Sequence, residues 1–109
     1  MTSIEKIIIR FYAANTFMFN DTEEKYYLIN EKDKVLSNIR VALKNELSVD
    51  MSEAQIKNKY RSLRDVFVKA NKLIELKKDL AFFQKCIYQR MFFLRPYICS
   101  NKKNNSFKL

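Results

Sequence analysis

Apolar side chains recur at steps of three and four residues in four stretches of this 109-residue chain. Such spacing places them on one face of an α-helix. The pattern therefore predicts helices over residues 2–14, 31–47, 52–74 and 79–93. The apolar face is most regular in the third stretch, which carries Ile56, Tyr60, Leu63, Phe67, Ala70 and Ile74.

Polar side chains mark the start of two of these helices. Thr2 lies three residues before Glu5, and Ser52 lies three residues before Gln55. This is the spacing of a capping box, in which each side chain accepts a hydrogen bond from the other residue's free backbone N–H. We therefore expect helices to begin directly after Thr2 and Ser52.

Helix-breaking residues are nearly absent, since the chain has no glycine and Pro96 is its one proline. This composition favours an all-α fold. Residues 15–31 predict an irregular crossing between the first two helices. Neither glycine nor proline occurs near Lys77 and Lys78, so the pattern leaves open whether the third and fourth helices are separate.

Composition also limits the chemistry. Without histidine the chain lacks the commonest metal ligand and general base, and without glycine it has no phosphate-binding loop of the Walker or dinucleotide type. The two thiols, Cys86 and Cys99, cannot complete a zinc site, and we expect them to be reduced and buried. We expect no enzyme activity, metal, cofactor or small-molecule substrate, and no stretch is apolar enough to cross a membrane.

Charge is divided unevenly along the chain. Residues 1–50 carry 7 basic and 8 acidic side chains, whereas residues 51–109 carry 14 basic and 4 acidic ones, which accounts for the net charge of +9. An excess confined to one half points to a polyanionic partner for that half.

The outer face of the third predicted helix concentrates this charge. Two helices joined by a short turn, the second capped and basic outside, resemble a helix-turn-helix, whose second helix enters the major groove of double-stranded DNA. Arginine can donate to guanine and asparagine can pair with adenine, while lysine contacts phosphates. The candidate DNA-binding residues are Lys57, Asn58, Lys59, Arg61, Arg64 and Lys69.

The aromatic residues divide into two groups. Phe11, Tyr60, Phe67 and Phe83 fall on the predicted apolar faces and are expected to fill the core. A platform on which single-stranded bases stack is the less favoured interpretation. Its members would be Tyr12, Tyr26 and Tyr27.

The order of these residues resembles the MADF domain, a Myb/SANT-like three-helix DNA-binding family, over residues 4–98. The family's Val-Lys-x-Lys-Trp-x-x-Leu-Arg-Asp segment is similar to Ile56-Lys57-Asn58-Lys59-Tyr60-Arg61-Ser62-Leu63-Arg64-Asp65. Its closing Phe-Leu segment is similar to Phe93-Leu94. Leu36 and Tyr60 stand where the family has its signature tryptophans.

This resemblance implies a three-helix Myb/SANT-like helix-turn-helix bundle with an additional C-terminal helix. It implies a domain over residues 2–98, and we expect the basic segment 99–109 to be a disordered tail. It further implies a nuclear rather than cytoplasmic protein that regulates transcription by sequence-specific DNA binding through its third helix.

Two other partners stay open. SANT-like folds also bind chromatin proteins, because a fold does not fix a function. A second copy of the chain could pair through the apolar fourth helix. Lys25 and Lys32 lie in the charge-balanced half, and we expect both to matter little for DNA binding.

Overall fold

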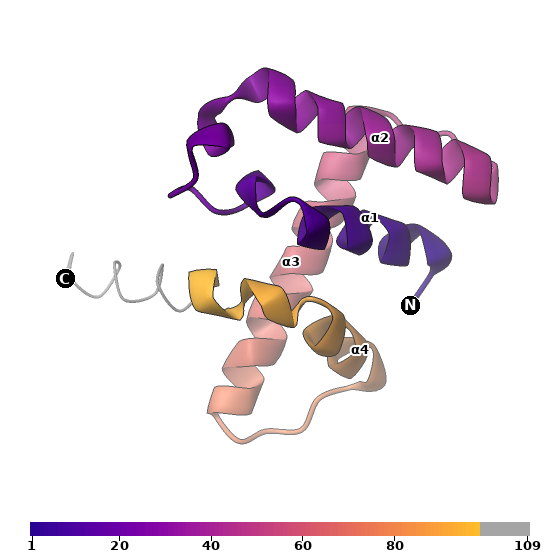
Figure 1. Cartoon of the computed structure of the whole chain (residues 1–109). Helices are drawn as coiled ribbons and strands as arrows, with labels where there is room; N and C mark the ends of the chain where they lie inside the picture. The colour runs from indigo at the N-terminus through magenta and orange to yellow at the C-terminus, as the bar shows by residue number, and fades with distance from the viewer. Residues whose placement is uncertain (99–109) are drawn as a thin grey trace. The chain divides into compact units, whose positions relative to one another are not determined.

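The computed structural model describes residues 1–98, and every regular element in them is helical. Its α-helices are α1 (Ser3–Ala14), α2 (Ile29–Leu47), α3 (Glu53–Glu75) and α4 (Phe82–Arg90) (Figure 1). Three short 3₁₀ helices are η1 (Thr16–Met18), η2 (Glu24–Tyr27) and η3 (Phe92–Leu94). The all-α class is confirmed, as is a helix beyond the first three. The expected disordered tail lies outside the described residues.

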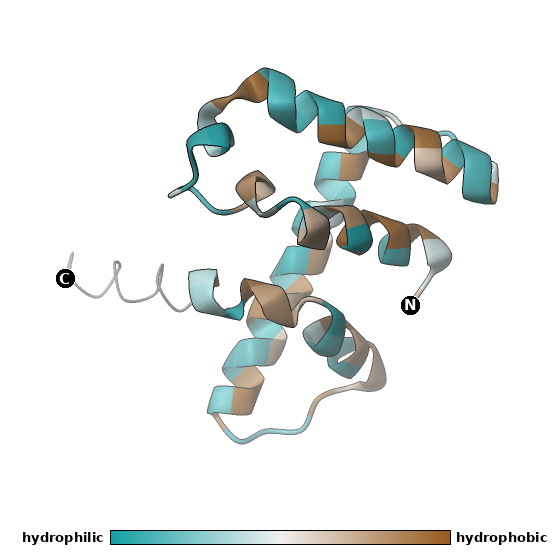
Figure 2. Ribbon diagram, in the orientation of Figure 1, coloured by the Kyte–Doolittle hydropathy of each residue, from teal (hydrophilic) through white to brown (hydrophobic). Residues whose placement is uncertain are grey.

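The described residues form two compact units that divide between Leu63 and Arg64, and α3 contributes residues to both. The first unit contains α1, α2 and the first half of α3. The second contains the rest of α3 with α4 and η3. Apolar and hydrophilic residues alternate along each of the longer helices, as the spacing predicts (Figure 2).

The core of the first unit takes one apolar face from each of its three helices. α1 packs against α2. Fully buried side chains come from all three helices: Ile8, Leu36, Ile39, Leu43 and Ile56. Tyr12 of α1 stacks on Tyr60 of α3, with ring centroids 3.6 Å apart and an angle of 4° between the rings. Tyr12 is therefore a core residue, and its predicted place in an exposed stacking platform is wrong.

Both predicted capping boxes are present. At α1 the Thr2 N–H donates to Glu5 Oε1 over 2.8 Å, and the Glu5 N–H donates to Thr2 Oγ1 over 3.3 Å. At α3 the Ser52 N–H donates to Gln55 Oε1 over 2.9 Å, and the Gln55 N–H donates to Ser52 Oγ over 3.1 Å. These short sequence motifs therefore fix where the first and third helices begin.

Two helices end on residues with left-handed backbone that are not glycine. Ser48 (φ 55°) follows α2, and Lys77 (φ 57°) follows α3. Past α3 the Lys77 N–H donates to the Ile74 carbonyl and the Lys78 N–H to the Leu73 carbonyl, each over 2.9 Å. This bonding closes the last turn and turns the chain away. The third and fourth helices are consequently separate.

In the second unit the predicted apolar faces extend further than the core. Ile87, Met91 and Leu94 are buried, and Phe67 stacks on Tyr88 with centroids 5.3 Å apart. Ile74 and Phe83 are 40% and 39% exposed, so their predicted burial is wrong. Ile74 lies in the last turn of α3 and Phe83 in the first turn of α4, which begins three residues later than predicted. An apolar face that continues into a terminal turn no longer meets an opposing helix.

We expect Leu63→Ala to lower the free energy of unfolding by about 2–5 kcal/mol, because Leu63 is 2% exposed and its loss leaves a cavity in the first unit. Urea unfolding measures the change. Val41→Ala is the matched control on an apolar residue that is 55% exposed, and it should change stability by less than about 0.5 kcal/mol. Equal effects of the two substitutions would contradict the assigned core.

Candidate nucleic-acid interface

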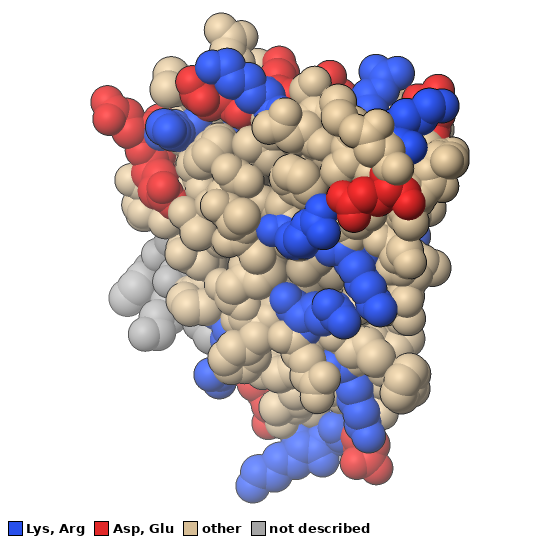
Figure 3. Space-filling model, turned by 45° about the vertical axis from the view of Figure 1, so that its right-hand side comes forward, with Lys and Arg blue, Asp and Glu red and all other residues tan. Residues whose placement is uncertain are grey.

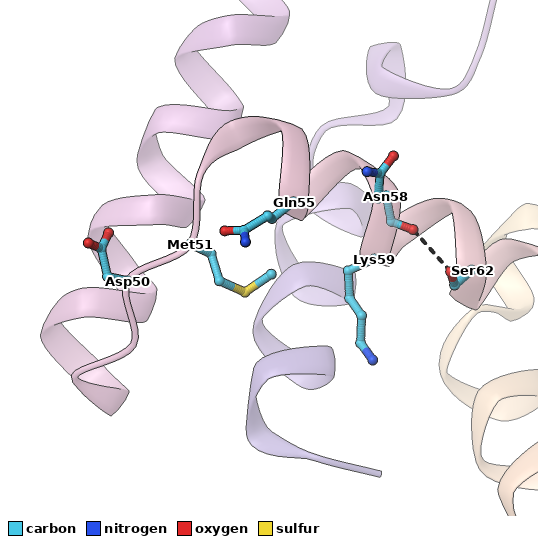
Figure 4. A pocket seen from close by; sticks show the side chains of 6 residues that line it. All are labelled: Asp50, Met51, Gln55, Asn58, Lys59 and Ser62. Atoms are coloured by element: carbon cyan, nitrogen blue, oxygen red, sulfur yellow. Dashed lines mark hydrogen bonds between the residues drawn. The ribbon is translucent and has the colours of Figure 1, made fainter.

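The exposed side of α3 begins directly after the capped turn. A shallow pocket of about 410 Å³ lies at this start and is lined by Asp50, Met51, Gln55, Asn58, Lys59 and Ser62 (Figure 4). The Ser62 hydroxyl donates to the Asn58 carbonyl over 3.1 Å and so adds a bond to the helix itself. In Figure 4 the side chains of Asn58 and Lys59 point in opposite directions from α3. Neighbours in sequence are therefore directed to different surroundings.

The six predicted DNA-binding residues all lie on α3 but differ in exposure. Lys57, Asn58 and Arg61 in the first unit are exposed. In the second unit Lys69 is exposed and Arg64 is half-buried. Among residues 1–98, none of the cations Lys57, Arg61, Arg64 and Lys69 has a carboxylate within ion-pair distance. Their charge is therefore available to an anion from outside.

Lys59 is different, because it already has a partner inside the first unit. Its Nζ lies 3.3 Å from Oε2 of Glu5, whose side chain is only 6% exposed. Burial raises the pKa of Glu5, but the hydrogen bonds from the Thr2 backbone and from Lys59, with the positive charge of Lys59, outweigh it and hold the pKa below its usual value. One carboxylate thus caps α1 and joins α1 to α3.

Another lysine of the first unit, Lys32, lies at the start of α2. Nζ of Lys32 lies 3.6 Å from the centroid of the Tyr26 ring, a cation–π contact. Burial lowers the pKa of Lys32, and the positive charge of Lys57 lowers it further. Sequence reasoning did not find the contact of Lys32 with Tyr26, because no periodicity links a residue of η2 to one of α2.

Basic and acidic side chains are mixed over part of the surface. Exposed pairs join Arg10 to Glu46 over 3.0 Å and Arg40 to Asp50 over 3.6 Å. In Figure 3, carboxylates stand among basic side chains in the upper part of the view, and basic side chains predominate below. The first 50 residues therefore neutralise much of their own charge.

Other kinds of site find little support within residues 1–98. No group of three metal-ligating side chains gathers there. Cys86 is a free, half-buried thiol, while Cys99 lies outside the described residues. None of the helices described is both long and apolar enough to span a bilayer.

The chain matches the family model described as "Alcohol dehydrogenase transcription factor Myb/SANT-like", a MADF DNA-binding domain, over residues 8–94. It belongs to the MADF family. The match covers most of the segment that resembled this family and includes the whole of α2, α3 and α4. The MADF family is one of DNA-binding domains and not of enzymes. Neither the curated proteins nor the solved structures gave a match to this chain.

The ion pair of Lys59 with Glu5 predicts that the stability of this MADF domain depends on pH. Glu5→Gln keeps an oxygen for the cap but removes the charge, so we expect a loss of about 1.5–3 kcal/mol at pH 7, the range of a hydrogen bond to a charged group. A lowered carboxyl pKa stabilises the fold above its usual value of 4.5. That stabilisation is lost as pH falls through the lower pKa of the folded state.

The two proteins should therefore converge in stability in acid, as measured by urea unfolding between pH 7 and pH 2. Glu46→Gln is the matched control, because its carboxylate joins Arg10 on the surface with 48% of the side chain exposed. The expected cost of removing that exposed pair is below about 1 kcal/mol. A Glu5→Gln effect that persisted unchanged in acid would exclude the ion pair as its cause.

Proposed function

We propose that the chain binds double-stranded DNA by placing the exposed side of α3, from Ser52 to Lys69, in the major groove. One observation carries the proposal: a capped helix of a MADF domain presents exposed cations for which residues 1–98 supply no ion-pair partner. Cations without an internal partner favour binding of an external polyanion such as DNA. Each DNA phosphate that such a cation neutralises releases condensed counterions, which contributes to the affinity.

Residue roles follow from side-chain chemistry and exposure. Asn58 and Arg61 carry groups that can donate to base edges, the amide to adenine and the guanidinium to guanine. Lys57 contacts a phosphate. Arg64 and Lys69, on the later turns of α3, add a further base or phosphate contact.

Lys59 takes a positioning role in this proposal. Its ammonium is held by Glu5, so it supports α3 from the side of α1 and is not counted among the phosphate contacts. From the sequence, Lys57 and Lys59 were equivalent candidates for phosphate contacts. They differ in their surroundings, because the ammonium group of Lys59 lies beside Glu5.

Sequence-specific binding of this kind would serve transcriptional regulation in the nucleus. The name of the matching family includes a transcription factor, which supports that role. Site selection from random duplexes tests it directly. Enrichment of one motif is the expected result, and uniform recovery of all sequences would contradict sequence-specific reading.

The proposed roles predict different effects of substituting Lys57 and Arg61. Lys57→Gln should weaken binding to every duplex and flatten the slope of log affinity against log salt by about 0.9, the value for one phosphate. Arg61→Gln should cost about 1–3 kcal/mol and relax preference at one base pair. Fluorescence anisotropy with labelled duplexes measures both.

Matched controls lie on α2 of the same unit. Lys44 is an exposed lysine, and Arg40 is an exposed arginine paired with Asp50. Their replacement by Gln should leave affinity and salt slope near the wild-type values. If the controls weaken binding as much as the α3 variants, the attraction is diffuse and α3 is not a reading helix.

A second copy of the chain is a further candidate partner, and exposed aromatic residues of α4 favour it. Phe82 and Phe83 are adjacent in sequence and 78% and 39% exposed. Burying a phenylalanine side chain contributes about 1.5–3 kcal/mol. In a dimer with two-fold symmetry, both copies would bury their own Phe82 and Phe83 in the same interface. Two copies would also read two half-sites.

Sedimentation equilibrium should accordingly show a concentration-dependent dimer that Phe82→Ser weakens at least tenfold. Tyr27→Ser is the control at another aromatic side chain, which is 71% exposed and lies in the first unit. A monomer at all concentrations, or equal weakening by both substitutions, would contradict pairing through α4.

A further inference from the structure

Gln55, in the first turn of α3, has its side-chain oxygen fixed by the helix cap. The Ser52 N–H donates to Gln55 Oε1 over 2.9 Å, and the Gln55 N–H donates to Ser52 Oγ over 3.1 Å. Because a backbone N–H can only donate, the amide atom that it meets must be the oxygen. The cap therefore decides which way round the Gln55 amide lies.

The nitrogen of the same amide, Nε2, is left for a ligand. Within residues 1–98 no hydrogen bond engages it, and the Gln55 side chain is exposed. Gln55 lines the shallow pocket at the start of α3 together with Asn58, three residues further along the helix (Figure 4). An amide nitrogen carries two N–H groups, so it donates and does not accept. Gln55 thus presents a donor to whatever enters this pocket.

Base edges in the major groove differ in how they match such a donor. Guanine presents two neighbouring acceptors there, N7 and O6, whereas adenine presents one acceptor beside an amino group and cytosine presents an amino group. Glutamine usually pairs with adenine, which needs the oxygen and the nitrogen of one amide to face the same base edge. In Gln55 the oxygen faces the Ser52 N–H, which leaves the nitrogen to face the base.

We propose that Gln55 reads a guanine in the major groove by donating from Nε2 to N7 and O6, with the Ser52 N–H as the group that orients its amide. This inference rests on the proposed function and adds a specificity-determining residue that the charge pattern of the sequence did not reveal. The position suits the role, because the N-terminal residues of the reading helix contact base edges in helix-turn-helix proteins.

Gln55→Glu is the most informative variant, because it keeps the cap and reverses the group that faces the base. One carboxylate oxygen still accepts from the Ser52 N–H, and the other puts an acceptor where Nε2 put a donor. Site selection with wild type should give guanine at one position where Gln55→Glu gives cytosine, whose amino group donates to a carboxylate. Fluorescence anisotropy should show that wild type prefers guanine there by about fivefold or more.

Gln84→Glu is the matched control for the added negative charge. Gln84 closes the start of α4 in a similar way, since its Oε1 accepts from the Ala81 N–H over 2.9 Å. This variant should weaken binding only through its charge and should leave the base preference at every position unchanged. Circular dichroism should show that both variants fold like wild type, because each keeps its capping oxygen.

A modified base identifies the atom that is read. 7-Deazaguanine, which has a C–H group in place of N7, replaces each guanine of the selected duplex in turn. At one position it should weaken wild type about fivefold or more. At the same position it should have less than about a twofold effect on Gln55→Glu and on Gln55→Ala, since neither variant has a donor there.

The possible outcomes distinguish a failure of this inference from a failure of the proposed function. If wild type selects one motif but Gln55→Glu keeps every base preference, this inference fails and the proposed function stands. If the position that depends on Gln55 prefers adenine, the cap does not orient the amide and the guanine assignment is wrong. If Gln55→Glu weakens all duplexes alike and more than Gln84→Glu does, Gln55 faces a phosphate and reads no base. If wild type selects no motif, both fail.

Discussion

The stack of Tyr12 on Tyr60 is the contact on which the arrangement of the first unit depends. Two nearly parallel rings 3.6 Å apart join the last turns of α1 to the middle of α3, and both are buried. Burial raises the pKa of Tyr12 to about 12, so its hydroxyl stays protonated at any physiological pH. Tyr60 stands where the resemblance places a family tryptophan. Both rings contribute apolar area to the core of the first unit.

A second contact between α1 and α3 complements the stack. The ion pair of Glu5 with Lys59 lies one residue before Tyr60 along α3. The apolar contact resists separation of the helices, while the charged contact restricts rotation of α3 about its axis, because it needs one side of the helix turned toward Glu5. Rotation matters for the exposed side of α3, since a turn of about 100° would exchange neighbouring side chains. The contacts facing inward therefore determine which residues face outward.

Features encoded by neighbouring residues were predictable from sequence. The caps at Thr2 and Ser52 need only a polar pair three residues apart, and the apolar face of α3 needs only its spacing. The exposed Phe83 and Ile74 were not predictable, because periodicity cannot tell where an opposing helix ends. The sequence likewise could not show which residues from other helices would lie beside a given charged side chain. Lys59 and Lys32 were assigned by their position in the chain, whereas their partners Glu5 and Tyr26 come from other helices.

The left-handed residues that end α2 and α3 have a consequence for how this chain could change. Left-handed backbone costs an ordinary residue about 1–2 kcal/mol, which glycine avoids. Ser48 and Lys77 adopt it in a sequence that contains no glycine at all. The turn between α2 and α3 is thus imposed by the packed helices and is not favoured by its own residues. A descendant of this sequence could therefore gain stability by a glycine at either position, away from the exposed cations of α3. The spare stability would then let the exposed side of α3 accept substitutions that themselves cost stability.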